Sequence, residues 1–228
     1  EPTNSAARDR GCGPATGRLV NEKVSVVSTG IGCPSTAIAV EELIEAGADT
    51  LIRVGSSGSM QPTVHTGDVV VATAAIRDEG TTSHYLPMEF PAVANTEVVN
   101  ALVAGATDLG LKAHTGVCQS KDSFYGEVER GRMPMAQHLE DRWNAWIAGG
   151  ALASEMEAAA LFILSAIYRK RAGGVMLVSL LLAVVVAVTV TRTIANPLTD
   201  LAATAGEIAA GNLALSAPVG REDETGEL

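Results

Sequence analysis

The sequence predicts an α/β domain built around a mostly parallel sheet, and three observations support this fold class. Short β-branched runs at 24–27, 50–54 and 68–73 have the length and composition of strands. A glycine turn, Thr29-Gly-Ile-Gly32, follows the first run, and an amphipathic stretch at 37–46 separates the first run from the second. A strand, a glycine turn, a helix and a second strand within about thirty residues form the unit from which parallel sheets are built.

The first helix is expected at 37–46, because Pro34 and Ser35 precede it and Gly47 is a typical helix stop. Its apolar residues recur at helical spacing and predict one buried face: Ile38, Val40, Leu43 and Ile44. The strand at 50–54 follows after three residues, and the strand at 68–73 continues the sheet.

Further elements alternate in the same way along the second half of the chain. Helical spacing at 96–109 ends at Gly110, and residues 114–119 follow as a strand. Residues 135–146 are expected to be helical. Residues 155–169 predict a strong helix that ends before a Gly-Gly pair, with these apolar residues on one face: Met156, Ala160, Leu161 and Leu164.

The composition limits the class of function. With 228 residues, of which 47% are hydrophobic and 18% charged, the chain can bury one sizeable core. A net charge of −10 without a basic face argues against nucleic acid as a partner, because binding a phosphate backbone requires clustered Lys and Arg. The cysteines Cys12, Cys33 and Cys118 lack the spacing of a metal site or a disulfide framework, which favours a reducing, cytoplasmic location.

The two ends of the chain have a different composition from the middle. Residues 1–20 are rich in Gly, Pro and Arg, predict a loop or disordered tail, and contain neither an initiator Met nor the apolar region of a secretory signal. Residues 172–190 are nineteen residues without a charge, the length that crosses a hydrocarbon core of about 30 Å. A membrane helix through 175–190 is therefore the favoured interpretation. The alternative is a buried strand at 175–178 followed by a buried helix.

Several motifs occur together in a fixed order between residues 24 and 178. They are Ser28-Thr-Gly-Ile-Gly-Cys-Pro-Ser-Thr36, Arg53-Val-Gly-Ser-Ser-Gly58, Asp122-Ser-Phe-Tyr-Gly126 and Ser154-Glu-Met-Glu157. In order and spacing this stretch, residues about 17–178, resembles the uridine phosphorylases. The resemblance implies a truncated three-layer α/β domain with a mixed central sheet. It also implies phosphorolysis of a pyrimidine nucleoside to free base and ribose 1-phosphate, with orthophosphate as co-substrate and no cofactor or metal, in a homo-oligomer.

The resemblance also assigns residues to the phosphate and ribose. Arg53, whose planar fork can meet two phosphate oxygens, is implied as a catalytic and phosphate-binding residue together with Ser56 and Gly58. Arg10 lies at the offset of an arginine that the family lends to a neighbouring subunit's phosphate. The ribose is implied to contact Glu155, Met156 and the catalytic Glu157. Without the resemblance, Arg53 could be a surface salt-bridge partner, and the two glutamates could be partners of a helix dipole.

On the base side, Phe124 matches an aromatic residue that packs near the base, and Arg130 could donate to a base carbonyl. Glu127 stands where related sequences have Gln, and a carboxylate can only accept hydrogen bonds where an amide can also donate, so the base preference is open. The family's upstream Gly-Asp-Pro phosphate loop has no counterpart here. An apolar span also replaces its downstream closing loop and last strand, so weak or no turnover is expected.

From about Ser179 the chain resembles the last transmembrane helix and HAMP linker of bacterial chemoreceptors and sensor kinases. Three segments carry this resemblance: 196–198, 206–213 and 223–228. The resemblance divides the chain into a tail at 1–20, the α/β domain at 21–178, an apolar, transmembrane helix at 179–195 and a partial HAMP-like segment at 196–228.

Two features of the sequence predict opposite membrane orientations for this arrangement. A HAMP linker places the α/β domain outside the cytoplasm, whereas Arg169-Lys-Arg171 before the span places it inside, at an inner membrane. A membrane-anchored signalling fragment and a non-functional fusion of two gene fragments are therefore the alternative hypotheses.

Overall fold

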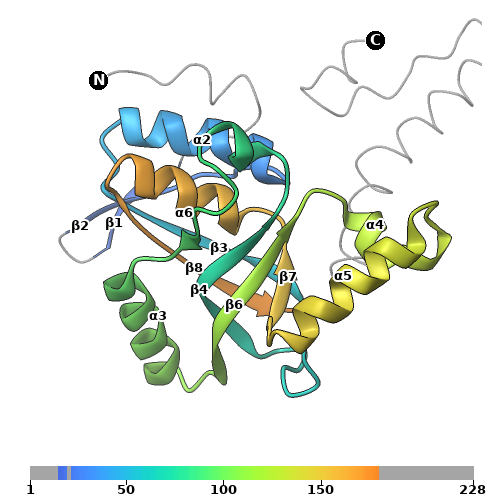
Figure 1. The fold of residues 1–228 in the computed structure, drawn as a ribbon. Coiled ribbons are helices and arrows are strands. Elements are labelled where there is room, and N and C mark those ends of the chain that lie inside the picture. The colour runs from blue at the N-terminus through green and yellow to red at the C-terminus, as the bar shows by residue number, and fades with distance from the viewer. Residues whose placement is uncertain (1–14, 20–21, 180–228) are drawn as a thin grey trace, which may run out of the picture. The chain divides into compact units, whose positions relative to one another are not determined.

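A computed structural model describes residues 15–19 and 22–179 of the chain. Its first elements are the strands β1 (Ala15–Leu19) and β2 (Glu22–Val26), which pair antiparallel in a hairpin that belongs to a separate two-stranded sheet (Figure 1). The prediction of a loop tail over 1–20 is wrong for 15–19. These residues form a strand because their backbone pairs with the predicted strand that follows.

The remaining strands form one mixed sheet, as the resemblance implies. They are β3 (Thr50–Ser59), β4 (Val69–Asp78), β5 (Ala92–Val93), β6 (Ala113–Lys121), β7 (Ala153–Glu155) and β8 (Arg171–Val178). The order is β5-β4-β6-β7-β3-β8, with β4–β6, β6–β7 and β3–β8 parallel and the β3–β7, β4–β5 and β4–β8 pairs antiparallel. The mostly parallel sheet expected from the strand–helix–strand pattern is therefore mixed.

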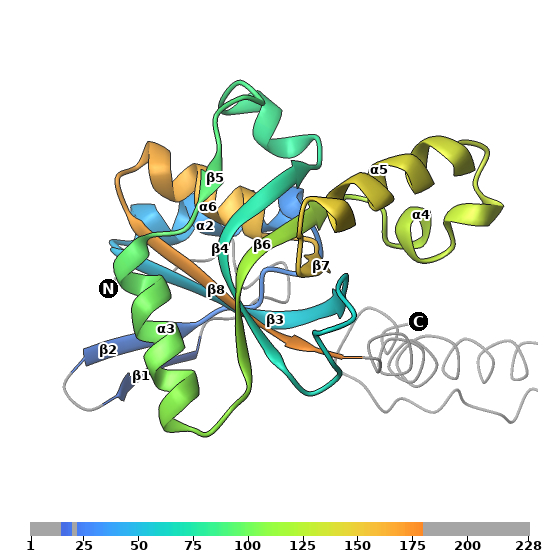
Figure 2. The ribbon, with the colours of Figure 1, turned by 60° about the horizontal axis from the view of Figure 1, so that its bottom comes forward.

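The last strand closes this sheet on itself. Strand β8 pairs with β3 along its whole length and with the first half of β4, while the second half of β4 pairs with β5 (Figure 2). Five strands thereby form a closed circuit: β4, β6, β7, β3 and β8. The closure is possible because β4 is ten residues long and offers the same edge to two successive partners.

Helices pack around the sheet at three places. Helices α2 (Cys33–Glu45) and α6 (Ala158–Ile167) lie side by side, and α3 (Thr96–Asp108) packs against β4 and β8 (Figure 1). The short α4 (Phe124–Val128) and the longer α5 (Ala136–Ala148) follow β6, with 3₁₀ turns at Thr81–His84 and Arg130–Arg132. Helix α6 is apolar on all sides and is the most deeply buried of the described helices, with eight of its ten residues buried.

The core lies between α2, α6 and the sheet. Its largest fully buried side chains include Phe162, Ile163 and Leu164 of α6 and Met176 of β8. Helix α3 approaches β8 at Gly173, where an added Cβ would lie 2.4 Å from Val98. A side chain at this glycine would force the helix away from the sheet.

Two predicted boundaries are wrong, and both matter for the site. The helix expected from residue 155 begins at Ala158, because Glu155 is the last residue of β7 and its carboxylate accepts the N–H groups of Glu157 and Ala158. The strand expected to end at residue 54 continues to Ser59, because β8 pairs with it through Ser57 and β7 pairs with it beyond. Arg53 therefore lies within a strand, not at its end.

The membrane interpretation is wrong for the first part of the apolar stretch. Residues 172–178 belong to β8, where Ala172, Met176 and Val178 are buried against the core, as the alternative of a buried strand requires. The rest of the proposed span and the HAMP-like segment lie outside the described residues. Within the described ranges, none of the helices is both long enough and apolar enough to cross a membrane.

Candidate active site

Arg53 is placed by the alternation of side chains along β3. Leu51, Arg53, Gly55 and Ser57 point to the inner side of the sheet, whereas Ile52 and Val54 are 50% and 81% exposed. The arginine side chain is only 14% exposed. It folds over the strand at Gly55, where an added Cβ would lie 2.4 Å from Nη1, so a glycine is needed beneath the guanidinium.

The Arg53 guanidinium contacts two carboxylates from the Ser154–Glu157 motif. Its Nε lies 3.0 Å from Oε2 of Glu155, and its Nη2 donates to Oε2 of Glu157. Burial alone would lower the pKa of Arg53, but these two carboxylates offset that effect and raise it above its ordinary value. The third nitrogen, Nη1, is buried and has no hydrogen-bond partner among the described residues.

Glu155 uses its carboxylate to hold the site together. Its Oε1 accepts from the Ser120 hydroxyl, and its Oε2 accepts the backbone N–H groups of Glu157 at 2.8 Å and Ala158 at 2.9 Å. The negative charge therefore lies at the N-terminus of α6, where the helix dipole stabilises it. Because its Oε2 already accepts two backbone N–H groups and contacts Arg53, Glu155 mainly positions its neighbours.

Glu157 joins two motifs that are far apart in the sequence. Its Oε1 accepts the backbone N–H of Gly32 at 2.6 Å, across 125 residues of chain. Gly32 has a φ of 92°, which favours glycine, and it precedes α2. The neighbouring Met156 is partly exposed, and its carbonyl accepts from the Cys33 thiol. Arg53, Glu155 and Glu157, together called the Arg53 cluster, thus connect β3, β7 and the start of α2.

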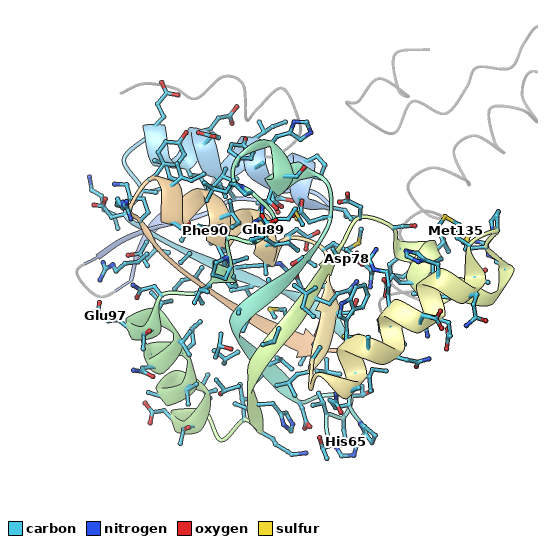
Figure 3. All side chains as sticks on the ribbon, in the orientation of Figure 1. His65, Asp78, Glu89, Phe90, Glu97 and Met135 are labelled. Atoms are coloured by element: carbon cyan, nitrogen blue, oxygen red, sulfur yellow. The ribbon has the colours of Figure 1, made fainter. Side chains whose placement is uncertain are left out.

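A second, largely buried polar cluster lies where β6 and β7 meet α4, and we call it the Gln119 cluster: Asp78, Gln119, Lys121, Glu127 and Ser154. The Gln119 amide nitrogen donates to Asp78 at 2.8 Å and to Glu127 at 3.0 Å, and its oxygen accepts from Ser154 at 2.6 Å. Lys121 donates to the same Ser154 hydroxyl at 2.5 Å. Figure 3 shows Asp78 between the sheet and α5, from which Arg142 pairs with it.

The charges of the Gln119 cluster are poorly compensated. Burial raises the pKa of Glu127, against the effect of Lys121, and the nearby Asp78 carboxylate raises it further. Burial likewise raises the pKa of Asp78, against its hydrogen bond from Gln119 and the charge of Arg142. Burial lowers the pKa of Lys121, although three glutamates act in the opposite direction. The second oxygen of Glu127, Oε2, is buried without a partner among the described residues.

Comparison with known proteins places the chain in a family. A profile described as the phosphorylase superfamily matches residues 3–209. The chain belongs to the phosphorylase superfamily. The match continues past Ser179 through part of the stretch that the sequence analysis interprets as a membrane helix and HAMP linker, and nothing in the comparisons supports that interpretation.

Individual relatives in the superfamily are close in sequence. The chain is 55% identical over 163 residues to a uridine phosphorylase of Treponema pallidum, which covers 72% of this chain and 63% of the relative. It is 48% identical over 164 residues to a uridine phosphorylase of Thermococcus kodakarensis, covering 69% of this chain and 58% of the relative. A guanosine phosphorylase of Halorubrum lacusprofundi is 40% identical over 152 residues, with 67% and 58% covered. The chain thus spans less than two thirds of these relatives.

The structure brings some of the predicted phosphate-site residues together and separates others. Arg53 and the ribose residues Glu155, Met156 and Glu157 converge. Ser56 and Gly58 lie on β3 at even positions, so alternation directs the Ser56 side chain away from the face that carries Arg53. Ser57, which the sequence analysis passes over, is on the Arg53 face, and its hydroxyl is buried without a partner among the described residues. Arg10 lies outside the described residues.

The predicted base-side residues gather around α4. Phe124 begins this helix, is partly exposed and packs edge-to-face on Tyr125, with the ring centroids 5.3 Å apart. Glu127 belongs to the Gln119 cluster. Arg130 turns to α5, where its Nε lies 2.7 Å from Glu140 and its guanidinium carbon lies 4.3 Å from the Trp143 ring centroid.

The sequence motifs do not predict four residues that the structure places in the site: Asp78, Gln119, Ser120 and Lys121. The available signal was the polar run Gln119-Ser120-Lys121 at the end of a strand that is otherwise small or apolar. Polar residues at the ends of sheet strands are candidates for ligand binding in superfamilies of this architecture. Among the described residues, no group of three or more His, Cys, Asp or Glu side chains is arranged to hold a metal ion.

Proposed function

We propose that this chain catalyses phosphorolysis of a pyrimidine nucleoside, with uridine as the model substrate. The relatives named uridine phosphorylase support the reaction class, and the Arg53 cluster supports the presence of its phosphate and ribose half. In this reaction an oxygen of orthophosphate bonds to C1′ of the ribose while the C1′–N bond breaks. The products are ribose 1-phosphate and the free base.

One observation carries the proposal. Arg53 is a largely buried cation whose Nη1 is buried and has no hydrogen-bond partner among the described residues, while two carboxylates fix its other nitrogens. A buried donor without a partner costs stability unless a ligand completes it. A phosphate oxygen is a strong acceptor for a guanidinium N–H, so orthophosphate matches this donor in charge and in hydrogen bonding.

The roles of the other site residues are assigned from their positions around Arg53 and α4. Glu157 would accept hydrogen bonds from ribose hydroxyls, and Met156 beside it would pack on the sugar. Developing positive charge on the ribose would be stabilised by the bound phosphate and by these carboxylates, which are fixed before substrate arrives. Phe124 and Glu127 would contact the base. A homo-oligomer and a cytoplasmic location complete the proposal, following the family resemblance.

The test is phosphate-dependent release of uracil. The purified chain is incubated with uridine with and without orthophosphate, and uracil and ribose 1-phosphate are measured by chromatography. We expect slow turnover that gives equal amounts of both products and occurs only with phosphate. Arg53→Met should lower kcat/KM by about 10²- to 10³-fold, the usual effect of removing one preorganised charge-stabilising group.

Arg171→Met is the matched control, because Arg171 is exposed at the start of β8 and pairs only loosely with Glu97, at 3.9 Å. It should retain activity within about twofold, as expected of an exposed ion pair. Absence of phosphate-dependent uracil release from the unaltered chain would refute the proposed function.

A further inference from the structure

Lys121 is a buried lysine that the roles proposed so far leave unused. It is the last residue of β6 and is 6% exposed. Its ammonium has three N–H donors, and within the described part of the chain its hydrogen bond goes to Ser154 Oγ, at 2.5 Å. Long charged side chains are rarely buried without being paired. Two donors are therefore available to a further acceptor.

The surroundings of Lys121 connect the two halves of the site. Its Nζ lies 5.9 Å from the centroid of the Phe124 ring, the residue expected to pack near the base. Glu127 on the base side and Glu155 and Glu157 on the ribose side all act electrostatically on it. The ammonium therefore stands close to the side on which a glycosidic bond between ribose and base would lie.

The Gln119 cluster fixes the direction of the ammonium. Ser154 Oγ accepts from Lys121 and donates to the Gln119 oxygen, while the Gln119 amide is held by Asp78 and Glu127. Each hydroxyl and amide in this chain of hydrogen bonds has its donor and acceptor roles determined by its neighbours. Such an arrangement orients the lysine before a ligand binds, which is the property required of a group that stabilises developing charge.

We propose that Lys121 is a catalytic residue that donates a charged hydrogen bond to a carbonyl oxygen of the departing pyrimidine base. The proposal rests on the proposed function. As the C1′–N bond breaks, its electron pair moves into the base and the negative charge spreads to the carbonyl oxygens. The phosphate oxygen forms the new bond to C1′. Lys121 keeps its proton while stabilising the base anion, which then takes a proton from water.

The competing role for Lys121 is purely structural, as the counter-ion of Glu127. The two roles differ in their dependence on the leaving group. A lysine that stabilises charge on the base matters less when the base itself bears negative charge more easily, as fluorinated uracil does. A counter-ion that only maintains the fold lowers activity on every nucleoside by the same factor.

The experiment compares Lys121→Met with the unaltered chain on uridine and 5-fluorouridine. We expect kcat for uridine to fall by about 10²-fold, in the range for loss of one catalytic donor, and the loss with 5-fluorouridine to be clearly smaller. We also expect kcat for uridine to decline at alkaline pH as Lys121 loses its proton, and this decline to be absent from the variant. Equal losses on both nucleosides together with an unchanged alkaline decline would overturn the proposal.

Two controls keep the test decisive. Lys23→Met, at an exposed lysine of the separate β1–β2 hairpin, should leave both rates unchanged. If Lys121→Met loses cooperative thermal unfolding, Lys121→Gln replaces it, because the neutral amide can still donate to Ser154. The same difference between the two nucleosides is then required of Lys121→Gln.

Failure of the proposed function is separable from failure of the Lys121 assignment. If the unaltered chain releases no base from either nucleoside, the proposed function fails, and Lys121 is judged by calorimetric binding of uracil. Binding that is at least about tenfold weaker in the Lys121 variant, a difference of about 1.4 kcal/mol, sustains the contact with the base. Equal affinity, or no binding of uracil to the unaltered chain, overturns it.

Discussion

The Arg53 cluster and the Gln119 cluster occupy adjacent strand ends but handle buried charge in opposite ways. In the Arg53 cluster one guanidinium meets two carboxylates, and those carboxylates also accept hydrogen bonds from three backbone N–H groups and one hydroxyl. In the Gln119 cluster a neutral amide lies between two carboxyl groups, and the nearby lysine contacts neither of them through a hydrogen bond in the described structure.

The difference shows which cluster is fixed and which can respond to pH. In the Arg53 cluster burial alone would lower the pKa of the guanidinium, but the attraction of the two carboxylates exceeds that effect and raises it. In the Gln119 cluster burial dominates, so that the pKa values of both carboxyl groups are raised and that of the lysine is lowered. Substitutions in the two clusters should therefore differ in size, in sign and in their dependence on pH.

The largest effect on stability is expected from Arg53→Met. It leaves Glu155 and Glu157 buried without their cation, and breaking a buried ion pair by removing one partner costs about 3–5 kcal/mol. Chemical denaturation, monitored by circular dichroism at pH 7, measures the change. A loss below about 1 kcal/mol would mean that solvent or the backbone already compensates these carboxylates.

A smaller loss is expected from Gly55→Ala. The new Cβ would lie 2.4 Å from Nη1 of Arg53, so the guanidinium must move and lose part of its contact with the glutamates. Forcing a methyl group into a packed site costs about 1–3 kcal/mol. Gly17→Ala, at a glycine with open space around its Cβ position, serves as the control. Comparable melting temperatures for both variants would contradict the close approach at Gly55.

Gln119→Leu tests whether the neutral amide organises the second cluster. The substitution removes the donor shared by Asp78 and Glu127 and the acceptor of Ser154. A buried group left without its partner costs about 1–3 kcal/mol, and because protonation relieves the two carboxyl groups, the total loss should stay within that range. The loss of stability should therefore be smaller at pH 5 than at pH 8. A loss independent of pH would show that the carboxyl groups are not ionised in the native protein.

The smallest effect, and one of opposite sign, is expected from Glu127→Gln. This isosteric change keeps the acceptor for Gln119 and removes a buried carboxylate whose Oε2 has no partner among the described residues. It should stabilise the fold by about 1 kcal/mol at pH 8. The raised pKa of Glu127 fixes the sign: the native state binds a proton more readily than the unfolded chain, so the gain should shrink as pH falls below that pKa. Destabilisation at pH 8 would contradict the assignment of an uncompensated charge.

The sequence is informative where partners are close along the chain. The β-branched runs predict the positions of β2, β3 and β4, and the apolar spacing predicts α2 and α3. The start of α6 was missed because Glu155 favours a helix N-terminus by composition, but pairs as the end of β7. Tertiary strand pairing of this kind overrides local preference.

The site residues, too, are predictable from the sequence only where they lie close together along the chain. Arg53 and the Ser154–Glu157 segment are recognisable because each belongs to a compact motif of distinctive composition. The Gln119 cluster was missed because its hydrogen bonds join residues 33 to 41 positions apart, except for the local contact between Gln119 and Glu127. No continuous sequence motif predicts such a cluster. It exists only once β6 and β7 are paired and α4 has closed over their ends.

The closed circuit of strands should slow the exchange of amide hydrogens in β8. Strand β8 is bonded to β3 on one edge and to β4 on the other, so its central amides cannot open without disturbing two neighbours. The β1–β2 hairpin has no such second edge in the described structure. In heavy water the β8 amides should therefore exchange their hydrogens only through opening of the whole domain, while those of the hairpin exchange through local fraying.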